Sequence, residues 1–388
     1  MTKVGIDLSR SESLIELLEM CDKQGATAEE KAIAMKQYIE FKARSKGVPM
    51  RGTLELTPLC NLDCKMCYVH LSKQQLSLEK STLLTGRQWI SIIQQAIECG
   101  MLEATLTGGE ALLHPDFDEI LSFLADKNIQ VNLKSNGVML TEDRIKFLKN
   151  KHIAVIQISL YGCDEDSYER VTGKRYFARV IDAIRCIKET GIPLEVVITP
   201  SIYMFSDIER ILRLVDSMGI RYSVNPGLIT PFEETGRAGQ NHDLNLEQYI
   251  DIYKMRAKIG GILIEKPCIE DIAKPGGNIQ EARVGLKCGA GRSVFAINWR
   301  GDVLPCRGLE SISFNGLETP FSDGWKYIND SVKKYPIPME CAGCKFEQIC
   351  PSCVIQHGIG AEIGHANKTL CQRALRLAEE GFIVRKDS

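Results

Sequence analysis

Cys60-Asn-Leu-Asp-Cys64-Lys-Met-Cys67-Tyr68 is the stretch around which the rest of the chain is organised. Its three cysteines form a CxxxCxxC pattern, soon after a strand-like run from Thr53 to Thr57. Thiolates bind soft metals, and three of them in a tight loop can hold three irons of a 4Fe–4S cluster. The fourth iron would then be open to a small molecule. A zinc loop is the competing interpretation, but zinc sites usually close with four ligands from CxxC pairs or histidines, and no partner pair lies nearby.

With the aromatic Tyr68 after the last cysteine, this pattern resembles the signature of the radical S-adenosylmethionine (SAM) enzymes. The resemblance implies that Cys60, Cys64 and Cys67 bind a catalytic cluster whose open iron chelates the methionine part of SAM, and that Tyr68 helps to bind SAM. One electron from the cluster then cleaves the sulfonium. The resulting 5′-deoxyadenosyl radical abstracts hydrogen from a substrate.

Composition and charge argue against several classes of protein. The chain has 388 residues, 44% of them hydrophobic, enough for one large or two modest domains. A net charge of −2 gives no reason to expect a nucleic acid or an anionic membrane as partner. We find no apolar signal segment and no apolar run that predicts a membrane span. Fifteen cysteines without a signal peptide indicate metal sites rather than disulfides. Because exposed iron–sulfur clusters need a reducing environment, we expect a cytoplasmic protein.

Strand-like and helix-like patterns alternate six times between residues 51 and 225. The apolar, β-branched runs are Thr53–Thr57, Ala104–Thr107, Gln130–Lys134, Ala154–Leu160, Leu194–Thr199 and Arg221–Asn225. Such alternation predicts a parallel sheet with helices outside it, and six units are too few to close a full barrel. Radical SAM enzymes commonly have such a partial barrel. We therefore expect an α/β fold with a partial (β/α)6 TIM-like barrel and its chemistry at the C-terminal strand ends.

Four regions are expected along the chain. Residues 1–50 carry helical patterns and predict an N-terminal helical element, and residues 51–225 would form the radical SAM core. Residues 226–267 contain order-breaking residues and predict a connector, and residues 268–388 hold a second group of cysteines. The first 50 residues lack strand patterning and are too few for the winged-helix domain with which some peptide-modifying relatives grip a leader peptide.

Candidate SAM contacts follow the second, third and fourth expected strands. They are Gly108, Gly109, Glu110, Ser135, Asn136, Ser159 and Arg170. Paired glycines let backbone approach a ligand, and a carboxylate can accept hydrogen bonds from an ammonium group. The resemblance implies that the Gly-Gly-Glu turn binds the amino group of SAM, that Ser135 and Asn136 lie beside its nucleoside, and that Ser159 and Arg170 bind its carboxylate. An ordinary turn, a strand cap and a surface arginine stay open as alternatives.

Seven cysteines occupy the last part of the chain, and their order resembles that of the SPASM domain, which holds two auxiliary 4Fe–4S clusters in radical SAM maturases. The last spacing of the CxxC-x5-C-x2-C group is more often x3 in that family. The resemblance assigns to the outer cluster Cys341, Cys344, Cys350 and Cys371. It assigns to the inner cluster Cys288, Cys306 and Cys353, with Cys268 or a substrate thiolate completing the set. Zinc ribbons are the alternative, but seven cysteines do not divide into two sets of four.

These resemblances predict an enzyme that generates a 5′-deoxyadenosyl radical and oxidatively modifies a ribosomally made peptide, for example with a thioether, C–C or C–O crosslink. Three 4Fe–4S clusters and SAM are the expected cofactors. The expected partners are a precursor peptide, a reductase such as flavodoxin or ferredoxin, and a separate protein that recognises the leader peptide.

Three alternatives remain at this point. Sulfatase-maturing relatives carry an acidic base directly after the second inner-cluster cysteine, where this chain has Arg307, so sulfatase maturation is disfavoured. A small-molecule substrate, such as a carbohydrate or a tetrapyrrole, fits the same motifs. A protein without catalytic activity could use the cysteines as an iron–sulfur or zinc scaffold or as an electron carrier.

Overall fold

The computed structural model describes residues 11, 13–78, 83–225, 242–259, 285–286, 288–341, 344, 346, 350, 353, 356 and 364–382. Two helices precede the sheet, α1 (Leu14–Lys23) and α2 (Ala28–Lys46). Each begins with a capping box, in which a Ser or Thr side chain and a Glu three residues later bond each other's backbone N–H groups. Helices are therefore present where the N-terminal patterns predict them.

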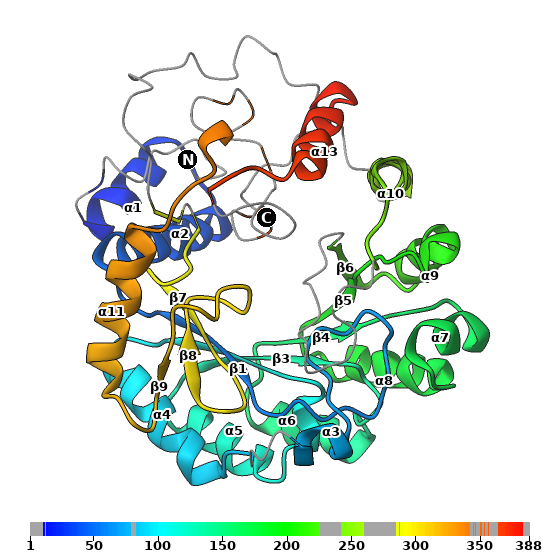
Figure 1. The fold of residues 1–388 in the computed structure, drawn as a ribbon, viewed down its shortest axis with the longest axis horizontal. Coiled ribbons are helices and arrows are strands. Elements are labelled where there is room, and N and C mark those ends of the chain that lie inside the picture. Colours follow the sequence, from blue (N-terminus) through cyan, green and yellow to red (C-terminus); the bar gives the residue numbers. More distant parts are fainter. Residues whose placement is uncertain are drawn as a thin grey trace.

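Nine strands form one sheet in the order β6-β5-β4-β3-β2-β1-β7-β8-β9. They are β1 (Arg51–Glu55), β2 (Glu103–Thr107), β3 (Gln130–Ser135), β4 (Val155–Ser159), β5 (Leu194–Ile198), β6 (Arg221–Val224), β7 (Val294–Ile297), β8 (Asp302–Leu304) and β9 (Phe314–Asn315). Strands β1 to β6 pair in parallel, each with the next in sequence. Figure 1 shows them along a curve. The expected α/β fold with a six-unit partial barrel is confirmed.

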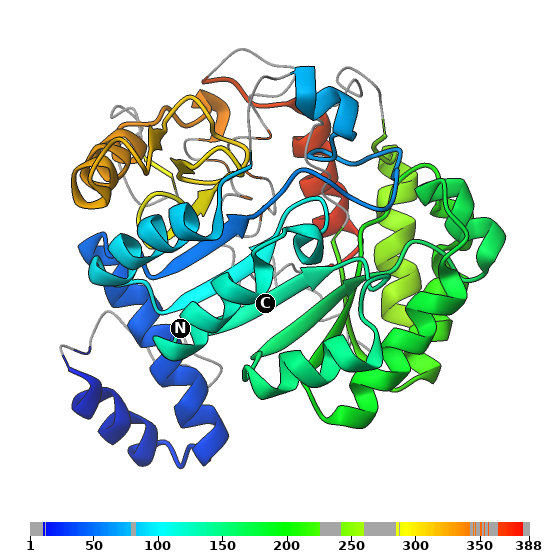
Figure 2. The same ribbon diagram turned by 90° about the horizontal axis from the view of Figure 1, so that it is seen from below.

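The helices that follow these strands cover the outer side of the curved sheet (Figure 1). They are α4 (Gly86–Glu98), α5 (Phe117–Asp126), α6 (Glu142–Asn150), α7 (Glu165–Thr172), α8 (Phe177–Thr190) and α9 (Ile208–Ser217), with short 3-10 turns at Ala111–Leu113 and Phe205–Asp207. The short helix α3 (Lys73–Leu78) lies beyond the C-terminal ends of the strands (Figure 2). Strand β2 shows why the sheet has two different faces. Ala104 and Leu106 are fully buried in the hydrophobic core, while the alternate residues Thr105 and Thr107 are only half-buried.

The C-terminal part of the chain continues the same sheet. Strand β7 lies parallel to β1, with Val294 opposite Arg51, and β8 and β9 follow it in antiparallel order. The pairing of this hairpin with β1 was not predicted from the sequence. Figure 2 shows this hairpin and α11 (Phe321–Lys333) next to α4, against which α11 packs. Trp325 Nε1 of α11 donates to the carbonyl of Gly47 at 2.6 Å, which ties α11 to the end of α2.

Two helices on the other side of the molecule complete the described fold. Helix α10 (Leu246–Ile259) packs against both α9 and α13 (Lys368–Glu379), and a short 3-10 turn covers Met339–Cys341. Residues 226–241 and 260–284 are outside the described part, so the expected connector is described only through α10, and Cys268 is not described. Within the described residues, no helix is both long enough and apolar enough to cross a membrane.

Candidate active site

The loop that carries the CxxxCxxC pattern leaves the C-terminal end of β1 and is fastened to α7. The backbone N–H groups of Asp63 and Lys65 donate to the carbonyls of Thr172 and Val171, at 2.9 and 3.1 Å. Because parallel strands share one C-terminal edge, this loop lies beside the turns that follow β2, β3 and β4. The motifs that the sequence singles out are thus gathered at one edge of the sheet.

N–H groups are directed at two of the loop's cysteine sulfurs. Cys60 Sγ accepts from the backbone N–H of Leu62 at 3.4 Å and from Asn136 Nδ2 at 3.5 Å, and Cys67 Sγ accepts from the backbone N–H of His70 at 3.3 Å. Burial raises the pKa of the Cys60 thiol to about 12, so the thiolate needs a nearby cation. Donors around the sulfur and a need for positive charge both suit a metal-bound thiolate.

The three cysteines of this loop are a donor set that suits an iron–sulfur cluster. Among the described residues, no three His, Cys, Asp or Glu side chains converge on a point where one ion could sit. A 4Fe–4S cube instead spreads three thiolates over three irons, which a short loop can do. Three thiolates on one short loop, two of them with N–H donors at sulfur, therefore fit the cluster that the sequence pattern predicts.

Gly108 and Gly109 bring the turn after β2 against the backbone that leads into the cysteine loop. The N–H groups of Gly109 and Glu110 donate to the carbonyls of Thr57 and Leu59, at 2.7 and 2.9 Å. A Cβ atom on Gly108 would lie 2.3 Å from the Thr57 carbonyl oxygen, and one on Gly109 would lie 2.4 Å from that of Leu59. Glycine is therefore required at positions 108 and 109 because the turn packs directly against another backbone segment.

We expect Gly109→Ala to destabilise the protein by about 3 kcal/mol, because backbone on both sides leaves no room for the added methyl group. The free energy of unfolding in urea and the iron content after anaerobic reconstitution would measure this. Gly191→Ala is the matched control. A Cβ there meets nothing within 4 Å, and only its positive φ of 77° should cost about 1 kcal/mol. Equal effects of the two substitutions would contradict the packing role of Gly109.

The Glu110 carboxylate is 1% exposed and is held by the end of β3. It accepts from Ser135 Oγ at 3.1 Å, from the backbone N–H of Asn136 at 2.8 Å and from that of Leu112 at 3.3 Å. Burial raises its pKa to about 7. A carboxylate has about four acceptor positions, so most of those on Glu110 have partners within the chain. The carboxylate thus fixes the position of Ser135 and Asn136, a role that the sequence motif did not suggest.

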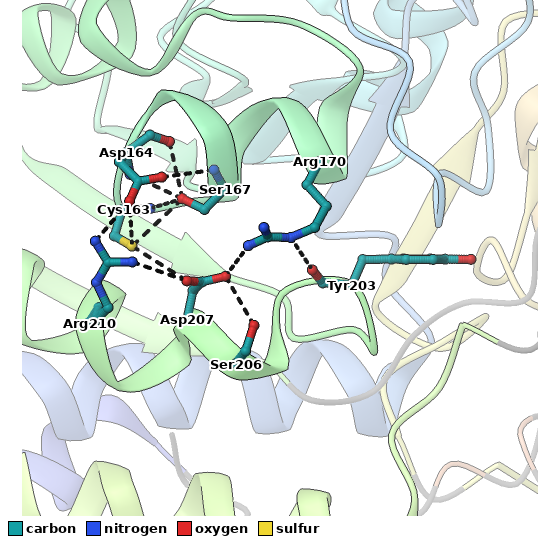
Figure 3. A network of polar contacts seen from close by, with 8 residues as sticks. All are labelled: Cys163, Asp164, Ser167, Arg170, Tyr203, Ser206, Asp207 and Arg210. Carbon is teal, nitrogen blue, oxygen red and sulfur yellow. Dashed lines mark hydrogen bonds and ion pairs between the residues drawn. The ribbon is translucent and has the colours of Figure 1, made fainter.

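Arg170 reaches the loop after β5. Its Nη2 forms an ion pair with Asp207, and its Nε donates to the carbonyl of Tyr203 at 3.3 Å (Figure 3). Asp207 also contacts Arg210, at 3.3 Å, and is only 6% exposed. Ser159 ends β4 and is half-buried. A SAM carboxylate at Arg170 would therefore have to share the guanidinium with Asp207.

A buried polar bridge links the Cys60–Cys67 loop, called the catalytic loop below, to the segment that carries Cys306. The Tyr68 hydroxyl donates to Glu55 Oε1 at 3.0 Å, and Arg307 Nε lies 2.7 Å from Glu55 Oε2. Glu55 is fully buried and Arg307 is 8% exposed. Because Tyr68 follows Cys67 and Arg307 follows Cys306, the bridge joins the two cysteine-bearing segments. Glu55 was not among the site residues predicted from the sequence. The available signal was its position as a charged residue at the end of an apolar strand.

The C-terminal cysteines fall into two neighbourhoods. The charges of Cys353 and Cys288 contribute to raising the pKa of Cys306, to about 11, although burial is the main cause. Burial is also the main reason why the pKa of Cys371 is raised, and the charges of Cys350 and Cys344 raise it further. Cys341 lies beside Cys344, whose N–H donates to its carbonyl at 3.3 Å. The structure thus places Cys306 near Cys288 and Cys353, and Cys371 near Cys344 and Cys350. The two ligand sets stay predictions, and Cys268 is outside the described residues.

Comparisons with known proteins agree with this fold. Residues 54–230 match the model of the radical SAM superfamily. The chain is 26% identical over 304 residues to a PqqA peptide cyclase from Streptomyces rochei, covering 74% of this chain and 78% of the relative. It is 24% identical over 322 residues to an AdoMet-dependent heme synthase from Methanosarcina barkeri, covering 77% and 89%. Among solved structures, Streptococcus suis SuiB bound to precursor peptide SuiA is similar, with a TM-score of 0.65, 18% identity and coverage of 92% and 88%.

The barrel, the cysteine loop and these matches together define the class of this protein. Residues 54–230 form a radical SAM domain, and the protein is a radical SAM enzyme with SAM and a 4Fe–4S cluster as cofactors.

Proposed function

We propose that this enzyme oxidatively modifies a ribosomally made precursor peptide, installing a thioether, C–C or C–O crosslink or a related change. The observation that carries the proposal is the direct link between the catalytic loop and the C-terminal cysteines through Tyr68, Glu55 and Arg307. Similarity to a peptide cyclase and to a maturase crystallised with its precursor peptide supports a peptide as substrate.

In this proposal Cys60, Cys64 and Cys67 hold the catalytic cluster. When bound, the clusters and SAM would supply a 5′-deoxyadenosyl radical and an acceptor for the electron that the substrate loses. The loop positions the cluster at the C-terminal edge of the sheet, and Tyr68 would lie against SAM with its hydroxyl fixed by Glu55. Close backbone packing of Gly108 and Gly109 would keep the second turn beside the amino group of SAM.

The remaining assignments concern the carboxylate of SAM and the auxiliary sites. Ser159 and Arg170 would bind the carboxylate, with Asp207 keeping the guanidinium oriented. Two auxiliary clusters would be bound by the C-terminal cysteines, the outer by Cys341, Cys344, Cys350 and Cys371. The inner would take Cys288, Cys306 and Cys353, with Cys268 or the substrate as fourth ligand. A flavodoxin or ferredoxin would deliver electrons in the cytoplasm, and a separate protein would present the leader peptide.

A small-molecule substrate is the second candidate, favoured by the similarity to a heme synthase at nearly the same coverage. Sulfatase-type maturation is disfavoured on structural grounds as well as by sequence. Arg307 occupies the position after Cys306, and it is paired with Glu55 at 2.7 Å and with Glu310 at 2.9 Å. A guanidinium carries only N–H donors and has no acceptor, so it cannot act as a base.

Mass spectrometry of a peptide substrate tests the proposal. The reduced enzyme would be incubated with SAM and the product of the short open reading frame beside its gene. We expect the peptide to lose two hydrogens for each crosslink formed, with 5′-deoxyadenosine released alongside. Formation of 5′-deoxyadenosine with an unchanged peptide would overturn the choice of peptide and favour the small-molecule candidate.

A further inference from the structure

The side-chain amide of Asn136 contacts a cysteine of the catalytic loop, although the two residues are far apart in sequence. Its Nδ2 lies 3.5 Å from Cys60 Sγ and 2.7 Å from Asn61 Oδ1. Asn136 is only 7% exposed. The two hydrogens of the amide group therefore have two acceptors in the loop, and one of these acceptors is sulfur.

The orientation of this amide is determined by its other contacts. Asn136 Oδ1 accepts from the backbone N–H of Val138 at 3.0 Å, and the backbone N–H of Asn136 donates to Glu110 Oε2 at 2.8 Å. Exchanging the oxygen and nitrogen of the amide would direct NH2 at the Val138 N–H and oxygen at the Cys60 sulfur. The nitrogen must therefore face Cys60, and Glu110 keeps the turn in place.

The turn itself does not require asparagine. A side-chain oxygen that accepts from the N–H two residues on can come from Asp, Asn or Ser. After the turn is made, Asp has no donor and Ser keeps one O–H on the accepting atom itself, whereas Asn keeps two N–H donors on a separate nitrogen that can reach a second partner. The donor to Cys60 is therefore the contact that distinguishes Asn136 from other turn-forming residues at this position.

We propose that Asn136 is a positioning residue that donates a hydrogen bond to the Cys60 thiolate and thereby raises the reduction potential of the cluster held by this loop. Hydrogen bonds to ligand sulfurs are among the factors that set cluster potentials. The reduced cluster carries one more negative charge, so a donor stabilises it more than the oxidised form. This inference rests on the proposed function only in taking Cys60 as a cluster ligand, and it does not depend on the substrate.

Redox titration of Asn136→Leu, followed by electron paramagnetic resonance, tests this role without any substrate. The catalytic cluster is identified as the one whose spectrum changes when SAM is added. At a fixed solution potential, we expect the ratio of reduced to oxidised catalytic cluster to fall about fivefold, since one charge-assisted hydrogen bond is lost. Signals from the other clusters should titrate as in the wild type.

Two further variants make the outcome decisive. Asn132→Leu removes an amide on β3, the strand that Asn136 follows, and the Asn132 amide donates to Glu103 Oε1 at 2.7 Å. This variant should leave the potential of the catalytic cluster unchanged. Asn136→Asp keeps an acceptor for Val138 but places oxygen towards Cys60, so its potential should fall further than that of Asn136→Leu. A wild-type potential in either loaded Asn136 variant would overturn the proposal. The proposal would also be overturned if neither Asn136 variant bound the catalytic cluster while Asn132→Leu did. Asn136 would then be needed for assembly of the cluster rather than for its potential.

Discussion

Replacing Cys60, Cys64 and Cys67 together by alanine is expected to abolish SAM cleavage. The three thiolates are the ligands proposed for the catalytic cluster, and without them SAM has no iron to chelate. We expect 5′-deoxyadenosine to fall at least about a thousandfold, to the level of the uncatalysed reaction. Iron content should fall by about four atoms per chain, while the auxiliary clusters remain. Liquid chromatography with mass spectrometry and iron analysis would measure both.

Cys186→Ala is the matched control for this variant. Cys186 lies on α8, half-buried against the core, and no cluster is assigned to it. It should retain wild-type iron content and SAM cleavage. If the triple variant still formed 5′-deoxyadenosine at a rate near that of the wild type, the loop could not be the catalytic cluster site.

Glu55→Gln is expected to lower the free energy of unfolding by about 3 kcal/mol, because it leaves the buried Arg307 without its closest carboxylate. Gln can still accept the hydrogen bond of Tyr68, so the loss would report the ion pair itself. We further expect weaker SAM binding, since Tyr68 would no longer be held by a charged partner. Urea unfolding and equilibrium binding of SAM would measure the two effects.

The double variant Glu55→Gln/Arg307→Met distinguishes a buried pair from two independent residues. Removing both charges relieves the cost of a buried, unpaired one, so we expect the double variant to regain most of the lost stability. Arg300→Met is the matched control, because Arg300 is a half-buried arginine on the same hairpin that contacts the ring of Trp299 rather than Glu55. Additive losses in the double variant would refute a direct Glu55–Arg307 interaction.

Most of the barrel could be predicted from sequence because its signals are local. Each parallel strand is a β-branched run bounded by turn residues, and the expected Gln130–Lys134 differs from β3 by one residue. Three helices, α3, α7 and α11, were not predicted. Helix α7 is short and carries many charged residues, and α11 contains Gly324. That glycine is explained by packing, since a Cβ there would lie 2.4 Å from the ring of Phe314.

Within the site, the sequence indicates the residue types but not their partners. The cysteine spacing and the Gly-Gly-Glu turn could be recognised because each is a short local pattern. The contact of Asn136 with Cys60 and the pairing of Glu55 with Arg307 join residues that are far apart in sequence. No local sequence pattern indicates either contact. The same holds for Glu110, whose carboxylate holds the end of β3. The ligand roles assigned to these residues stay predictions.

The central claim is that the Cys60 to Cys67 loop holds a cluster that cleaves SAM, and anaerobic turnover of the wild-type protein tests it most directly. The chain would be reconstituted with iron and sulfide, reduced, mixed with SAM and assayed for 5′-deoxyadenosine and methionine. The account predicts both products in equal amounts, in a reaction that depends on the reductant. Zinc in place of iron in protein purified without oxygen, or no 5′-deoxyadenosine from fully loaded and reduced protein, would contradict it.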